Sequence, residues 1–236
     1  MRKPMGTDWI YPQVRGRVVA RRGRAHIFDV MNAASTAIVV IDLQMHFMSP
    51  GFPGELPTAR DIVPAVNALV DRGRDLGATI IWVTTAAVRT RTIWPLYATQ
   101  LLTEAQTSTR EASLEGEGAP LWTDLHVAAA DHLVQKTMFS AFAPDSSDLP
   151  VLLGRLGCDT LVIAGAATNT CCDSTARDAA MRNFRTTMVG DALAARSDDE
   201  HTAALSNFYG SFGDVQTVDQ VIAALQRGRS APVGRP

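Results

Sequence analysis

The sequence predicts an α/β protein with three layers, in which a mostly parallel, doubly wound sheet of about six strands lies between two layers of helices. Two observations lead to this prediction. Short apolar runs alternate along the chain with longer segments of helical periodicity, and the clearest runs are continuously apolar, as in parallel strands that are buried on both faces. The composition agrees, because 46% of the 236 residues are hydrophobic and 19% are charged.

The first strands of the predicted sheet come from residues 36–41, 78–84 and 132–134. The first two runs, TAIVVI and ATIIWVT, consist almost wholly of apolar and β-branched residues, as expected for buried strands. Between them, apolar side chains in residues 61–76 recur at a near-helical period, and Gly77 supplies a stop signal. This segment is therefore expected to be a crossover helix.

The segment between the second and third strands is expected to be a helix followed by a loop. Residues 92–106 have helical spacing. Residues 110–120 contain three Glu, two Gly and one Pro, so they are expected to form a polar loop at the rim of a site or at an interface.

The remainder of the chain continues the alternation. In chain order we expect a helix over residues 147–156, a strand over 160–164, a helix that begins at Cys171, a strand over 184–189, a helix over 197–209, a strand over 214–217 and a helix over 218–225. Ser197 and Glu200 form a capping box at the start of one of these helices. Strands that alternate with helices favour right-handed crossovers in one parallel sheet.

The chain is expected to consist of a basic N-terminal arm (residues 1–34), one domain (35–228) and a flexible tail (229–236). Residues 1–24 hold seven Lys or Arg against one Asp, a net charge of +6, which leaves −8 for the remainder. The arm is expected to be extended, with one strand-like piece over 17–20, and to dock on the acidic domain or on a neighbouring subunit. No nucleic-acid motif accompanies it, so no nucleic-acid partner is expected.

The cysteine content and the apolar runs restrict the class of protein. Three cysteines, two of them adjacent, do not form a disulfide framework. No apolar run approaches the 18 or more residues of a membrane span, and the N-terminus lacks the apolar stretch of a secretory signal. We therefore expect a cytoplasmic protein with no membrane partner.

Cys171 is the first candidate for chemistry. It follows a predicted strand and a turn of small residues, and it is expected at the N-terminus of a helix, where unpaired N–H groups and the helix dipole favour a thiolate. The alternative is a small buried residue that packs a helix against the sheet, since free cysteine is often buried. Cys172 lies about 100° further around the helix and is assigned to packing.

Two further polar residues also follow predicted strands. Asp42 comes directly after the apolar run 36–41, and Lys136 follows the short strand 132–134. Ligands of open parallel sheets bind beyond the carboxyl ends of the strands, so Asp42, Lys136 and Cys171 are expected to converge at one edge. Taken singly, the Asp could cap a turn and the Lys could lie on the surface.

The sequence around these residues resembles a known family. The segments GAATNTCCDSTARDA, AIVVIDLQMHF and DHLVQKTMFSAF are similar, in this order, to blocks of the isochorismatase-like cysteine hydrolases, which include nicotinamidases, N-carbamoylsarcosine amidase and ureidoacrylate amidase. The resemblance covers about residues 35–228. It implies an isochorismatase-like fold and a homodimer or homotetramer.

The resemblance also implies roles for individual residues. Carried onto this sequence, the family triad is Asp42, Lys136 and Cys171. The oxyanion hole would be formed by the backbone N–H groups of Ala167 and Cys171, next to a cis peptide bond between Ala166 and Ala167. The family pattern Asp-x-Gln-x-x-Phe matches Asp42, Gln44 and Phe47, and its Phe lines the substrate pocket.

The loop after the second strand departs from the family. A nicotinamidase would have a His-rich, metal-binding run there, whereas this chain reads TAAVRTRTIWP. The five histidines show no metal-ligand spacing, so we expect no metal and no cofactor. Trp94 is a candidate wall of the substrate pocket, and Arg89 or Arg91 a candidate ligand of a substrate carboxylate.

The sequence thus predicts a hydrolase for non-peptide C–N bonds that acts on a small amide, carbamoyl or ureido compound. Cys171 would form an acyl-enzyme, Asp42 would act as base and acid, and Lys136 would give electrostatic support. Two alternatives remain: a vinyl ether hydrolase of the isochorismatase type, and a non-catalytic oligomeric binding module. A redox role for Cys171 and Cys172 is weaker, because adjacent cysteines form a strained disulfide.

Overall fold

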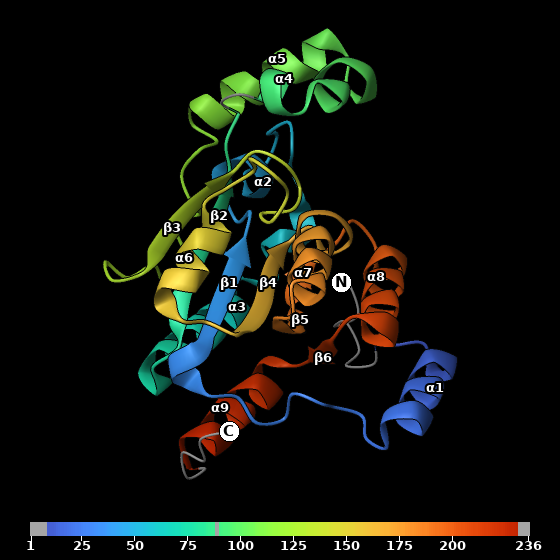
Figure 1. The fold of residues 1–236 in the computed structure, drawn as a ribbon. Helices are drawn as coiled ribbons and strands as arrows, with labels where there is room; N and C mark the ends of the chain where they lie inside the picture. The colour runs from blue at the N-terminus through green and yellow to red at the C-terminus, as the bar shows by residue number, and fades with distance from the viewer. Residues whose placement is uncertain (1–8, 88–89, 231–236) are drawn as a thin grey trace.

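The protein contains a six-stranded sheet in which all strand pairs are parallel, in the order β3-β2-β1-β4-β5-β6 (Figure 1). The computed structural model describes residues 9–87 and 90–230. The strands are β1 (Thr36–Ile41), β2 (Thr79–Thr85), β3 (His132–Lys136), β4 (Thr160–Ala166), β5 (Arg185–Ala194) and β6 (Asp214–Gln216). The predicted α/β class and the strand number are confirmed.

Helices cover both faces of this sheet (Figure 1). One face packs against α3 (Val63–Leu76) and α9 (Val218–Ser230); the other packs against α6 (Leu149–Leu156), α7 (Asp173–Met181) and α8 (Asp198–Ser211). The central strand β1 is fully buried, with Ile38 and Val40 in one hydrophobic cluster and Val39 and Ile41 in the other. This double burial explains why the strand is apolar throughout.

The N-terminal segment differs from the prediction. Residues 17–20, expected to be strand-like, lie within the helix α1 (Pro12–Arg22), which begins with Pro at its first position and ends at Gly23 in the left-handed conformation. Tertiary contacts stabilise this helix, since Val18 is fully buried in the cluster that includes α8. Residues 1–8 lie outside the described part of the chain.

A helical module replaces the predicted loop over residues 110–120. It consists of α4 (Thr90–Ile93), the π-helical turn η3 (Tyr97–Leu101) and α5 (Glu104–Glu115), and it projects beyond the carboxyl edge of the sheet (Figure 1). The side chain of Thr103 caps α5 by accepting a hydrogen bond from the amide of Gln106, whose side chain bonds in return to the Thr103 amide. Only the end of the predicted loop is non-helical.

The remaining helical segments are short. They are η1 (Ala33–Ser35), α2 (Met45–Met48), η2 (Pro57–Ala59) and the π-helical turn η4 (Thr168–Cys172). The last helix, α9, extends to Ser230, so the predicted tail begins too early; residues 231–236 lie outside the described residues. Within the described chain, we find no helix with the length and apolar character required to cross a membrane.

Candidate active site

The candidate site lies where the connections of the sheet change direction. The chain winds outward from β1 to β2 and β3 on one side and from β4 to β5 and β6 on the other, so the carboxyl ends of β1 and β4 form a topological switch point. Asp42 follows β1, Lys136 ends β3, and Cys171 lies in the helical turn after β4. The structure thus brings all three predicted residues together.

The contacts among these side chains are direct. Lys136 Nζ lies 2.8 Å from Asp42 Oδ2 and donates a hydrogen bond to Cys171 Sγ at 3.4 Å. The side chains of Asp42 and Lys136 are almost completely buried. Burial of an ammonium or a carboxylate is costly when it is unpaired, so each charge compensates for the other.

Thr85 completes this cluster, although it was not among the residues predicted from the sequence. Its hydroxyl donates a hydrogen bond to Asp42 Oδ1 and accepts one from Lys136 Nζ, both at 2.8 Å. Because a hydroxyl has one proton, its donation to the carboxylate requires that the ammonium is the donor in the second bond. A polar residue at the carboxyl end of β2, adjacent to β1, was the available signal.

The backbone at the switch point is closely packed. Gly165 of β4 has φ of +110°, and a Cβ atom at this position would lie 2.1 Å from the carbonyl oxygen of Ile41. A side chain cannot be accommodated there, so the site requires glycine. Asp42 itself adopts φ of 57°, and its amide donates to the carbonyl of Val83 at 2.8 Å. Both features fix the position of the Asp42 carboxylate.

Cys171 differs from the prediction in two respects. The helical turn begins at Thr168, so Cys171 lies inside the first turn rather than at its first residue. Burial, followed by the charge of Asp42, raises the pKa of its thiol to about 12, although Lys136 acts in the opposite direction. The resting group is therefore a thiol next to a carboxylate, not the thiolate expected from a helix N-terminus alone.

Lys136 keeps its positive charge in spite of its position. Burial disfavours the ammonium, but the negative charge of Asp42 and the contact with Cys171 together raise the pKa of Lys136 above its usual value. The cluster thus contains a neutral thiol, an ammonium and a carboxylate within hydrogen-bond reach. This arrangement can transfer the thiol proton to the carboxylate and stabilise the negative charge that results.

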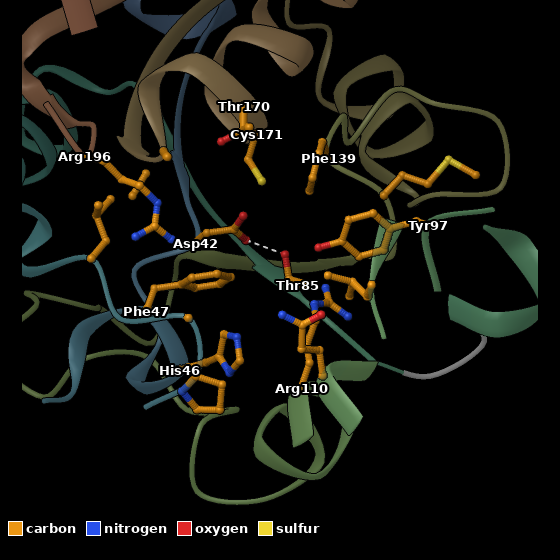
Figure 2. Close-up of a pocket in the computed structure, with 18 of the residues that line it drawn as sticks. Asp42, His46, Phe47, Thr85, Tyr97, Arg110, Phe139, Thr170, Cys171 and Arg196 are labelled. Carbon is orange, nitrogen blue, oxygen red and sulfur yellow. Dashed lines mark hydrogen bonds between the residues drawn. The ribbon is translucent and has the colours of Figure 1, made fainter. Parts of the chain in front are cut away.

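The cluster opens into a cavity of about 580 Å³ (Figure 2). Asp42, Thr85 and Cys171 line it, together with Ala166 and Ala167, whose shared peptide bond is cis. Aromatic side chains from three segments line its walls: Phe47, Tyr97 and Phe139. A cavity of this size and mixed lining suits a small organic molecule.

Of the three predicted substrate-binding residues, only one lines the cavity. Phe47 lines the cavity, whereas Gln44 and Trp94 do not. The amide of Gln44 bonds to the backbone N–H and C=O of Thr85 and to the carbonyl of Ala119, so it positions the end of β2. Trp94 stacks on Tyr97 at 4.4 Å between ring centroids and thereby supports a wall residue.

The arginines also differ from the prediction. Arg91 binds Glu104 and Glu111 on the exposed side of the module and does not line the cavity, while Arg89 lies outside the described residues. Two other arginines, Arg110 from α5 and Arg196 from the loop after β5, do line it. Neither residue was predicted from the sequence.

Two neighbouring features have structural roles. Cys172 is fully buried, with Sγ 3.9 Å from the carbonyl oxygen of Ala164, consistent with packing. Arg177 pairs with Asp173 one turn earlier on α7, at 2.7 Å. The described residues contain no group of three or more His, Cys, Asp or Glu side chains that could hold a metal ion.

Comparison with known proteins identifies the family. The isochorismatase domain family matches residues 36–220, so the chain belongs to this family and the resemblance noted in the sequence is confirmed. An uncharacterized isochorismatase family protein of Bacillus subtilis, YwoC, is 30% identical over 197 residues, which cover 81% of this chain and 94% of the relative.

A relative with a named activity is the maleamate amidohydrolase of Pseudomonas putida, 27% identical over 80% of this chain and 86% of that protein. A cysteine hydrolase from Pseudomonas syringae has the same fold, with a TM-score of 0.71, 23% identity and coverage of 84% of this chain and 95% of that one. The prediction of a hydrolase for non-peptide C–N bonds is confirmed at the level of the family.

Proposed function

We propose that the protein hydrolyses the C–N bond of a small amide, carbamoyl or ureido compound through an acyl-enzyme on Cys171. The observation that carries this proposal is the contact of Cys171 Sγ with Lys136 Nζ, beside the buried Asp42, in the lining of an open cavity. The related maleamate amidohydrolase supports an amide as the substrate.

In the first half of the reaction, Asp42 takes the thiol proton while Sγ attacks the carbonyl carbon. A base is required at this step because the pKa of Cys171 is raised to about 12, so the thiol does not ionise by itself near neutral pH. The backbone N–H groups of Ala167 and Cys171 would stabilise the oxyanion, and Lys136 the charge around sulfur. The protonated Asp42 then gives its proton to the departing nitrogen.

In the second half, water attacks the thioester and Asp42 accepts a proton from it. The thiolate leaves the tetrahedral intermediate and regains a proton from Asp42, which restores the resting site. The products are an acid and ammonia or an amine. With a ureido or carbamoyl substrate the acid is a carbamate, which decays to carbon dioxide and an amine.

Ammonia release tests this proposal. Wild type and Cys171→Ala are assayed in parallel on primary amides, ureido acids and carbamoyl amino acids, with Cys172→Ala as a control that removes a buried thiol outside the cavity. We expect release by wild type and Cys172→Ala, and at least a thousandfold loss in Cys171→Ala. Comparable release by Cys171→Ala would refute the assignment of the nucleophile.

A further inference from the structure

The helical module carries one polar face toward the cavity. Ala105, Gln106, Thr109 and Arg110 of α5 line the cavity, and their spacing of one, three and one residues places them on one side of the helix. Figure 2 shows Arg110 extending from α5 into the pocket, on the side opposite to Cys171. The module therefore presents a cation to whatever occupies the site.

Within the described part of the chain, Arg110 has no anionic partner. No carboxylate there forms an ion pair with it, and no acceptor takes a hydrogen bond from it; its guanidinium carbon lies over the ring of Tyr97, 5.6 Å from the ring centroid. Such stacking uses the face of the guanidinium and leaves its N–H groups free to bind a ligand. Arg91, on the same module, instead binds two glutamates.

The other charges of the cavity leave Arg110 uncompensated. Asp42 is neutralised by Lys136 at 2.8 Å. Arg196, which is exposed, and Glu200 also line the cavity. Among the described residues, Glu200 forms no ion pair with Arg110. Arg110 is half-buried, and its charge acts on His46, whose pKa is lowered to about 4 first by burial and then by this arginine. A half-buried guanidinium without a partner is stabilised by an anionic ligand.

We infer that Arg110 binds a carboxylate of the substrate, so that the protein selects small amides that bear a carboxylate group. This inference rests on the proposed function for the reacting end of the substrate. The amide carbonyl would lie at Cys171, and the carboxylate would lie across the cavity at α5. A planar guanidinium can bind both oxygens of a carboxylate, which neither Gln106 nor Thr109 can do.

Binding measured without turnover tests this inference. In the Cys171→Ala background, calorimetry measures the affinities for malonamate, succinamate and hydantoate and for their neutral amides. The same affinities are then measured with a second substitution, Arg110→Gln, Arg110→Lys or Arg196→Gln. Arg155→Gln, exposed on α6 and outside the cavity, removes the same charge as a control.

We expect at least one acid to bind about tenfold to hundredfold more tightly than its neutral amide, as for a charge-assisted hydrogen bond. Arg110→Gln should remove this preference, Arg110→Lys should keep part of it, and Arg155→Gln should not change it. Three results would each overturn the inference: equal binding of acids and neutral amides, no binding of any acid, or a preference that survives Arg110→Gln and disappears in Arg196→Gln.

Turnover separates this inference from the proposed function. Acids that bind through Arg110 but are not hydrolysed by the protein with Cys171 intact would support the subsite and contradict the hydrolase. Conversely, hydrolysis that depends on Cys171 but does not distinguish acids from neutral amides would support the hydrolase and contradict the subsite.

Discussion

The central residues of the site form a closed set of contacts in which each hydrogen-bonding group has a defined task. Lys136 touches Asp42, Thr85 and Cys171. Thr85 holds the Asp42 oxygen that does not face the ammonium. A carboxylate held in this way can accept a proton without rotating away from the thiol, and fixed geometry of this kind lowers the barrier to reaction.

Substitution of Thr85 tests this positioning role. Thr85→Val keeps the shape but removes the hydroxyl that bonds to Asp42 and Lys136, whereas Thr85→Ser keeps the hydroxyl. We expect kcat to fall about tenfold to hundredfold in the Val variant, with a smaller change in the Ser variant.

A pH profile distinguishes positioning from mere packing at Thr85. Thr85→Val removes a hydrogen bond from both charged partners, Asp42 and Lys136, so the pH dependence of kcat/KM should differ from that of wild type, whereas a residue that only fills space would leave it unchanged. An unchanged profile in Thr85→Val, with kcat equal to wild type, would contradict the role.

At the scale of elements, the close approach of β4 to β1 fixes the edge on which the site is built. Gly165→Ala would force a Cβ atom against the carbonyl of Ile41 at a residue with φ of +110°. We expect the free energy of unfolding to fall by about 2 kcal/mol or more, from backbone strain and the clash together. Chemical denaturation measures this change.

Gly154→Ala is the matched control for that substitution. Gly154 lies in α6 with no atom near its would-be Cβ, so alanine there should stabilise the protein by roughly 0.5–1 kcal/mol. Equal effects of the two substitutions would contradict the account of the β1–β4 contact.

The sequence predicted the buried elements well and the polar helices poorly. Strands such as β1 and β4 are apolar throughout because both faces are covered, and this signal is local. Helix α5, by contrast, buries only Thr107 and Leu114, so its pattern is weak and its Glu and Gly content resembles that of a loop. Helix α1 buries Val18 alone, so its apolar pattern is also weak and the helix was not predicted.

The candidate site was predictable only in part. Asp42, Lys136 and Cys171 each follow a strand, and parallel topology alone predicts that they converge. The raised pKa of Cys171 could not be predicted, because it depends on burial and on the distance to Asp42. Arg110 was missed because its place in the cavity follows from the fold of the module around it.

At the scale of the whole molecule, the N-terminal segment is held against the end of α8. Arg21 donates a hydrogen bond to the carbonyl of Gly210, and Arg22 donates to those of Tyr209 and Gly213. Tyr209 and Gly210 lie in the last turn of α8 and Gly213 lies just after it, and cations are favoured at this end of a helix by its dipole. Arg21 and Arg22 thus have partners within their own chain.

Two buried histidines make the stability of the whole molecule dependent on pH. Burial lowers the pKa values of His46 and His201 from 6.5 to about 4. Between these values the unfolded chain binds protons that the folded protein does not, so stability falls as pH decreases from about 6.5 to 4. We expect a loss of roughly 3 kcal/mol for each histidine over this range.

Denaturation at pH 7 and pH 4.5 measures this loss in wild type and in His46→Asn. The variant should lose less stability than wild type between the two pH values, and His132→Asn, on the edge strand β3, should lose as much as wild type. His46 also accepts or donates a hydrogen bond at Ser113, 2.8 Å away, so the module is expected to loosen in acid. An identical pH dependence in wild type and His46→Asn would contradict this account.

The most direct test of the central claim is to trap the acyl group on Cys171 during turnover. Hydroxylamine is added to wild type hydrolysing an amide, and the hydroxamate product and the mass of the peptide that contains Cys171 are measured after an acid quench. The account predicts hydroxamate formation and, where deacylation is slow, an acyl group on Cys171, neither of which occurs in Cys171→Ala. Ammonia release with no hydroxamate and no acylated Cys171 would contradict it.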